Sequence, residues 1–102
     1  MGAFAVLSEP TRLRILEELR ASESSVGDLV ARLSVSQPTM SKHLKVLREA
    51  GFVSCSPAAQ RRIYRIESRP FEAVEEWLAP YRRLWTKRLD ALERHLDSQE
   101  ER

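Results

Sequence analysis

A group of short hydrogen-bonding side chains and cations lies between positions 36 and 45, at the spacing of a helix. The amide of Gln37 can pair bidentately with adenine, the hydroxyl of Ser41 can donate or accept at several base edges, and Lys42 can reach guanine or phosphate. Thr39 and His43 fall on the flanks of this face and suit backbone phosphates better than bases. The candidate nucleic-acid contacts in this segment are therefore Ser36, Gln37, Thr39, Ser41, Lys42, His43 and Lys45.

A second polar group, Gln60, Arg61 and Arg62, is predicted at the tip of a hairpin, where it could straddle the phosphate backbone or enter the minor groove. Positions 36–65 carry six lysines and arginines against one acid, Glu49, although the whole chain has a net charge of only +2. A basic middle between acidic ends is the electrostatic footprint expected for a polyanion partner. Charge alone is equally compatible with a solvated basic face that binds nothing.

Contacts of this kind need a helix that buries its other side. Met40, Leu44 and Leu47 fall together on the face opposite the polar group, which predicts that they are core residues. Ser36 is a suitable N-cap and Gly51 follows the last periodic residue, so the pattern predicts a helix over about 37–50.

Upstream, the periodicity predicts shorter helices. The first covers Ala3–Leu7, and the second begins at an N-cap on Ser8 and continues to about residue 22, with leucines at every third position (Leu13, Leu16 and Leu19). The run Ser25-Val-Gly-Asp28 has the form of a capping box and opens a third helix, whose Leu29, Val30 and Leu33 should face inward. A three-residue turn at 34–36 then leads into helix 37–50, which is the layout of a helix-turn-helix.

Beyond Gly51 the pattern changes from helical to alternating. It predicts short strands at 52–55 and 63–66 joined by a turn at 57–60, and a long amphipathic helix over 70–97 that Pro80 should kink or break. The predicted fold class is mainly α with a small β-hairpin, a winged helix-turn-helix with a long C-terminal dimerisation helix. We expect a single domain over 1–102, with a recognition helix at about 37–50 and a wing at about 52–67.

The last helix carries more apolar surface than a small domain can bury alone, which predicts a two-fold homodimer. Two recognition helices would then lie about 34–36 Å apart on an inverted repeat. The alternative is that Trp77 and Trp85 belong to an intramolecular core only. The expected dimer contacts are Phe4, Leu7, Tyr81, Leu84, Trp85, Leu89, Leu92 and Leu96.

The run Ser36-Gln-Pro-Thr-Met-Ser-Lys-His-Leu-Lys-Val-Leu-Arg-Glu-Ala-Gly-Phe-Val53 resembles the recognition helix and following strand of the ArsR family of bacterial repressors. The upstream run Ser8–Leu16 and the wing Gln60–Ile66 resemble the matching family segments, so the resemblance covers essentially the whole chain. It implies a winged-helix fold, a dimer, operator binding near a promoter and effector-controlled release. One departure is Ala59-Gln60, where the family often has glycine, and this predicts a stiffer or differently shaped turn.

Many members of that family sense soft metals through a Cys-Val-Cys on the helix before the recognition helix. This chain has Ser25-Val26-Gly27 there, and it has only His95 where a second family site uses two histidines. The sole cysteine, Cys55, is predicted to be a small buried hydrophobe rather than a reactive thiol. We therefore predict no metal and no cofactor. Release by a small organic ligand, a protein partner or a falling repressor concentration all remain open.

Composition excludes several classes. Apolar residues are 42 % and charged residues 31 %, which indicates a globular chain, and no apolar run approaches membrane-spanning length. A cytoplasmic location is the expectation.

Because the sequence lacks a nucleophile with a nearby base, a carboxylate pair in a plausible cleft and a glycine-rich phosphate loop, it predicts no enzyme. The favoured function is a sequence-specific DNA-binding repressor that occludes promoter DNA. The alternative is a winged-helix protein-interaction module without specific DNA binding.

Overall fold

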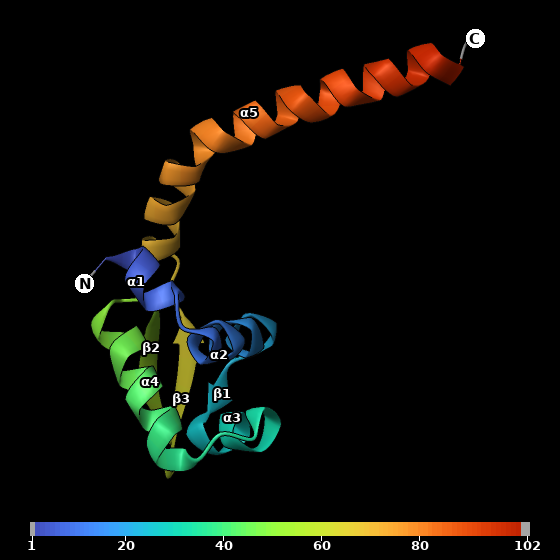
Figure 1. Ribbon diagram of the computed structural model, residues 1–102. Coiled ribbons are helices and arrows are strands. Elements are labelled where there is room, and N and C mark those ends of the chain that lie inside the picture. Colours follow the sequence, from blue (N-terminus) through green and yellow to red (C-terminus); the bar gives the residue numbers. More distant parts are fainter. Residues whose placement is uncertain (1, 101–102) are drawn as a thin grey trace.

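The computed structural model describes the backbone of residues 2–100 and the side chains of residues 2–99. A compact body of short helices and a small antiparallel sheet lies at one end, and one long helix leaves it at the other (Figure 1). The elements in chain order are α1 (Ala3–Leu7), α2 (Pro10–Ala21), β1 (Ser24–Ser25), α3 (Val26–Leu33), α4 (Gln37–Glu49), β2 (Val53–Ala58), β3 (Arg61–Ile66) and α5 (Arg69–Glu100). The predicted winged helix-turn-helix with a long C-terminal helix is confirmed.

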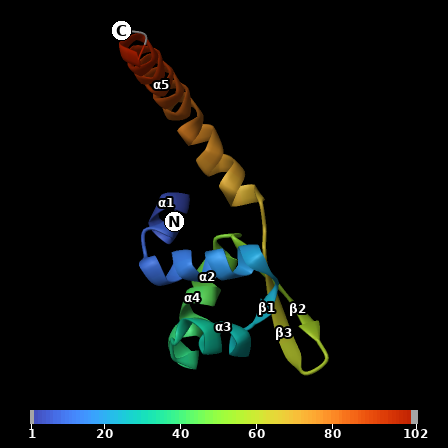
Figure 2. The ribbon, with the colours of Figure 1, turned by 90° about the vertical axis from the view of Figure 1, so that its right-hand side faces the viewer.

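The sheet has three strands in the order β1-β3-β2, so the predicted two-stranded hairpin gains a third strand, β1, that was not predicted from the sequence. The predicted turn at 57–60 was too long, because Pro57 and Ala58 extend β2 and pair with the start of β3. Pro57 is tolerated there because β2 is an edge strand. The turn is the dipeptide Ala59-Gln60, and Ala59 adopts a left-handed conformation with φ of 58°. The hairpin projects beside α3 (Figure 2).

The core lies between the three helices α2–α4 and the sheet, and it includes the predicted Met40, Leu44 and Leu47. Leu13 is an exception to the predicted stripe: it is 43 % exposed, because Ile15, Leu16 and Leu19 already fill the inner face of α2. Cys55 was predicted to be buried but is only half-buried. The other buried apolar residues are Val6, Leu29, Leu33, Phe52, Val53 and Tyr64.

The helix ends follow the predicted capping signals with one correction. The N-cap of α2 is Glu9 and not Ser8, because the Glu9 carboxylate accepts a hydrogen bond from the Arg12 backbone N–H at 2.9 Å. The Ser8 hydroxyl instead donates to the Ala5 carbonyl at the end of α1. After α4, Gly51 takes φ of 83°, and the Phe52 N–H donates to the Leu47 carbonyl at 2.9 Å, which closes a Schellman motif.

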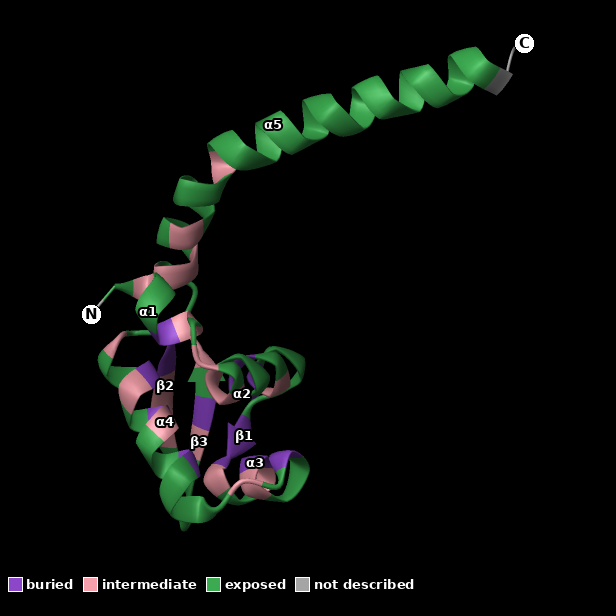
Figure 3. Ribbon diagram, in the orientation of Figure 1, coloured by how far each residue is buried: buried purple, intermediate pink, exposed green. Residues whose placement is uncertain are grey.

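Helix α5 runs for 32 residues and stays continuous through Pro80, with a bend about a third of the way along (Figure 1). The proline kinks it without breaking it. Phe4 of α1 packs edge-to-face on Trp77, with ring centroids 5.0 Å apart. Farther along, α5 is exposed all round (Figure 3), and the radius of gyration of 19.1 Å exceeds the roughly 13 Å of a compact chain of this size. Among the described residues, no helix, α5 included, is both long enough and apolar enough to cross a membrane.

Candidate nucleic-acid interface

Helix α4 is held on the body by its apolar face and presents its polar face outward. Ser34 turns the chain between α3 and α4 with a left-handed φ of 55°, and the Ser36 hydroxyl accepts the Thr39 backbone N–H at 3.4 Å. Met40 and Leu47 on the opposite face are fully buried. The side chains left exposed on α4 and its N-cap include Ser36, Gln37, Thr39, Ser41, Lys42 and Lys45. The exposed face therefore offers an amide, hydroxyls and ammonium groups to a groove.

His43 is placed differently from the rest of the predicted set. It is half-buried, and its Nδ1 lies 3.8 Å from a carboxylate oxygen of Glu9 at the start of α2. The carboxylate also caps α2, and its pKa is lowered: desolvation raises it, but the Arg12 N–H and the nearby His43 outweigh that effect. His43 therefore sits at the contact between α4 and α2, away from the exposed amide and hydroxyls.

The wing separates its two arginines. Gln60 is exposed in the turn, and Arg62 is exposed on the next strand. The Arg61 guanidinium, in contrast, donates to Ser25 Oγ at 2.5 Å and to Asp28 Oδ2 at 2.9 Å. Arg61 thus joins the first residue of β3 to the start of α3. The sequence alone does not predict this contact, because its partners lie 36 and 33 positions away and leave no local pattern.

Ser25 and Asp28, which accept these hydrogen bonds from Arg61, form the predicted capping box of α3. That capping box is confirmed. The Ser25 N–H donates to Asp28 Oδ2 at 3.0 Å, and the Asp28 N–H donates to Ser25 Oγ at 3.1 Å. These hydrogen bonds from Ser25, aided by the Arg61 charge, hold the pKa of the Asp28 carboxyl below its ordinary value. In the segment where the resemblance would place paired thiolates, this chain therefore has a capped helix end and an ion pair. Within residues 2–99, no three metal-ligating side chains come together.

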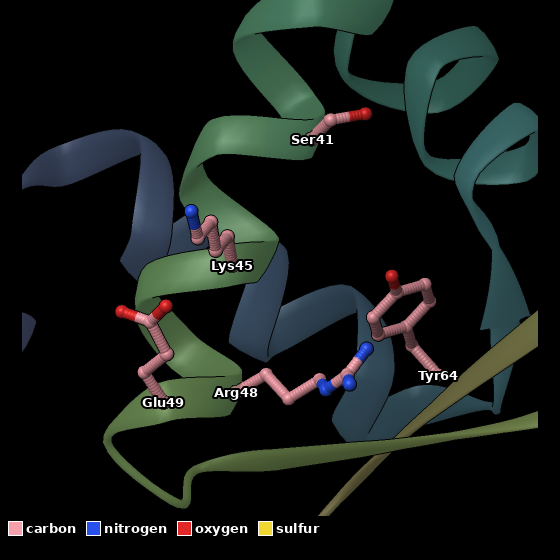
Figure 4. A pocket seen from close by; sticks show the side chains of 5 residues that line it. All are labelled: Ser41, Lys45, Arg48, Glu49 and Tyr64. Carbon is pink, nitrogen blue, oxygen red and sulfur yellow. The ribbon is translucent and has the colours of Figure 1, made fainter.

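A hollow of about 270 Å³ lies between α4 and β3, and Figure 4 shows its walls. Ser41, Lys45 and Arg48 line it from α4, and Tyr64 enters from β3 with its hydroxyl directed toward the helix. Burial, together with the neighbouring Cys55, raises the pKa of Tyr64, so its hydroxyl stays protonated at neutral pH. Arg48 and Tyr64 were not among the predicted contacts. For Arg48 the sequence held a signal, because this residue lies three positions after Lys45 on the same side of α4.

The predicted dimer residues are mostly exposed in the single chain. Leu7 packs partly against the core, while the most exposed of the set is Trp85 at 62 %. The other large apolar side chains of this set, all about half exposed, are Phe4, Tyr81, Leu84, Leu89, Leu92 and Leu96. Phe4 comes from α1 and the remainder from α5, so one apolar surface spans both helices.

Comparison with known proteins supports the fold and the class of site. Residues 9–54 match the family model described as bacterial regulatory protein, arsR family. The chain is 36 % identical over 97 residues to the HTH-type transcriptional regulator Rv2034 of Mycobacterium tuberculosis, covering 95 % of this chain and 88 % of that protein. It is 45 % identical over 60 residues to a biofilm growth-associated repressor of Agrobacterium fabrum, covering 59 % of this chain and 51 % of that repressor. A crystal structure of the ArsR family transcriptional regulator RHA00566 superposes with a TM-score of 0.71 and 33 % identity, over 83 % of this chain and 88 % of that one.

Proposed function

This chain belongs to the arsR family of bacterial regulatory proteins and is a DNA-binding transcriptional regulator, and from that premise we propose that it is a homodimeric repressor. The dimer binds an inverted repeat in promoter DNA and blocks access of RNA polymerase, until an effector or a fall in concentration releases it. The observation that carries the proposal is the arrangement of α4, whose apolar face is buried in the core while its opposite, polar face is exposed.

The contacts with DNA follow from that face. In the proposed complex Gln37, Ser41 and Lys42 enter the major groove from the first turns of α4, where side-chain amides, hydroxyls and ammonium groups meet base edges. Thr39 and Lys45 lie beside them and suit phosphates. On the wing, Gln60 and Arg62 are free to approach the neighbouring backbone.

The dimer follows from the apolar surface on α1 and α5. Leucines at 84, 89, 92 and 96 remain about half exposed because the body of the domain does not reach them. Burial of apolar area is worth about 25 cal/mol per Å², so a second copy that covers this surface gains a large stabilisation. A two-fold axis along α5 pairs identical surfaces, as closed dimers require.

The test is selection of bound sequences from random duplex DNA, followed by footprinting and sedimentation with and without the selected site. We expect an inverted repeat with half-site centres about 34–36 Å apart, occupied by a dimer. Gln37→Ala should weaken binding to that site by about 1–3 kcal/mol and leave binding to random DNA nearly unchanged.

Two results would contradict the proposal. Weak binding without any enriched sequence would favour the protein-interaction module, and a monomer at micromolar concentration would remove the inverted repeat. A run-off transcription assay on a template that carries the selected site separates repression from other regulation. Repeating the selection with candidate small molecules addresses release.

A further inference from the structure

The hollow between α4 and β3 brings three hydrogen-bond donors to one place, from Ser41, Arg48 and Tyr64 (Figure 4). Ser41, Lys45 and Arg48 follow one another along α4 at intervals of four and three residues, so they share the side of the helix that faces the wing. Tyr64 closes the opposite wall, with a residue exposure of only 8 % and its hydroxyl on the side of α4 (Figure 4).

The charges of this hollow are available for a ligand. Among the ion pairs of residues 2–99, none uses Arg48, whereas Arg61 and Arg65 each have an acidic neighbour. Lys45 and Glu49 also line the hollow, but the ammonium and the carboxylate both point away from Tyr64 and the Arg48 guanidinium (Figure 4). A site with one cation and two hydroxyls favours an anion whose several oxygens accept hydrogen bonds.

The position of the hollow indicates which anion it takes, on the basis of the proposed function. A recognition helix in the major groove and a wing that reaches the adjacent minor groove stand on either side of one sugar-phosphate strand, because a single strand separates the two grooves. We propose that the hollow holds one phosphate of this strand, and that Arg48 and Tyr64 are DNA contacts in addition to those on the outer face of α4.

This site positions the protein on DNA and carries no base preference, since phosphates are the same at every sequence. Arg48→Ala should weaken binding to selected and random DNA alike, by about 3- to 10-fold, and lower the salt slope by about 0.9. Tyr64→Phe removes only a hydroxyl, so it should weaken binding by about 2- to 5-fold without changing that slope. Glu49→Gln should tighten binding because it removes a negative charge from the rim.

The decisive experiment replaces single phosphates of the selected site by uncharged methylphosphonates, one position at a time. For the wild-type protein, we expect several positions in each half-site to weaken binding, and one of them, the phosphate held in the hollow, to do so by about tenfold. In Arg48→Ala the same replacement should have little effect, because its partner is already absent. Arg20→Ala is the matched control: it removes the same charge from the end of α2, outside the hollow, and should leave the wild-type profile intact.

Each result bears on the inference separately from the proposed function. If Arg48→Ala adds its effect to that of every methylphosphonate, the hollow is no phosphate site, although sequence-specific binding through α4 stands. If the wild-type protein enriches no sequence, the proposed function fails and this inference fails with it. Circular dichroism of each variant verifies the fold. Because Arg48 is exposed and Tyr64 is buried, Arg48→Ala tests the site even if Tyr64→Phe disturbs the fold.

Discussion

Arg61 and Arg62 are neighbours in sequence, yet their environments predict opposite roles in DNA binding. Both side chains are exposed on β3, but the Arg61 guanidinium is hydrogen-bonded to Ser25 and Asp28 at 2.5 and 2.9 Å. A cation that neutralises one phosphate contributes about 0.9 to the slope of log K against log salt. We therefore expect Arg62→Ala to lower the slope by about 0.9, and Arg61→Ala to leave it at the wild-type value.

The carboxylate of Asp28 supplies a second variant. In Asp28→Asn the charge that holds Arg61 is gone, so the guanidinium can turn to the DNA backbone and the slope should steepen by up to about 0.9. Between 50 and 200 mM salt, such a change amounts to about a 3.5-fold difference in affinity. The double variant Asp28→Asn with Arg61→Ala should return to the wild-type slope.

Fluorescence anisotropy on the selected site, at four or five salt concentrations, measures the slopes of the wild type and the four variants. Helix content and thermal unfolding serve as controls, because Asp28 also caps α3. Equal slopes for Arg61→Ala and Arg62→Ala would refute this reasoning. In that case Arg61 leaves the carboxylate on binding, and the ion pair belongs to the free protein only.

Three further predictions concern stability. Leu44→Ala should lower the free energy of unfolding by about 2–5 kcal/mol in urea titrations, against less than about 0.5 kcal/mol for the exposed control Lys42→Ala. Gly51→Ala should lower the free energy of unfolding by about 1–2 kcal/mol, because Gly51 has φ of 83° and alanine is strained there. The added methyl group would meet only Pro70, at 3.6 Å, so an unchanged stability would contradict the conformational argument. Because the capping hydrogen bonds from Ser25 hold the pKa of Asp28 below its ordinary value, its ionised form stabilises the fold at pH values above that ordinary pKa. This contribution is lost as pH falls through the lowered native pKa, so the unfolding of Asp28→Asn should depend less on pH in the acid range.

Local signals in the sequence predicted most of the fold, because the elements are specified by residues within one or two turns of each other. Ser25 with Asp28 and Ser36 with Thr39 make the expected caps, and Gly51 ends α4 as expected. The buried face of α4 followed from spacing alone. The winged helix-turn-helix was thus predictable in outline, with strand ends less accurate than helix ends.

Several of the misses share a physical cause, because each depends on residues distant in sequence. The N-cap at Glu9 instead of Ser8 is a local miss. The two serines of β1 have neither β-propensity nor alternation, and they form a strand only because β3 lies alongside. The half-burial of His43 depends on Glu9, at the start of another helix. Arg61 lies at the start of a strand with an ordinary basic pattern, and only the folded chain shows that α3 occupies its guanidinium.

The fold keeps the surface proposed to bind DNA separate from the surface proposed to bind a second copy of the chain. The exposed cations of α4 and the wing lie on the body, whereas the half-exposed apolar side chains lie on α5, which points away from it (Figure 1). In the proposed dimer, contact along α5 therefore leaves α4 and the wing uncovered in both copies. Since α1 packs on the first part of α5 through Phe4 and Trp77, a shift of α5 in the proposed dimer would reach the body through that contact. Under the proposed function, an effector that changed the angle between the two bodies would release the DNA without touching the helix that meets the bases.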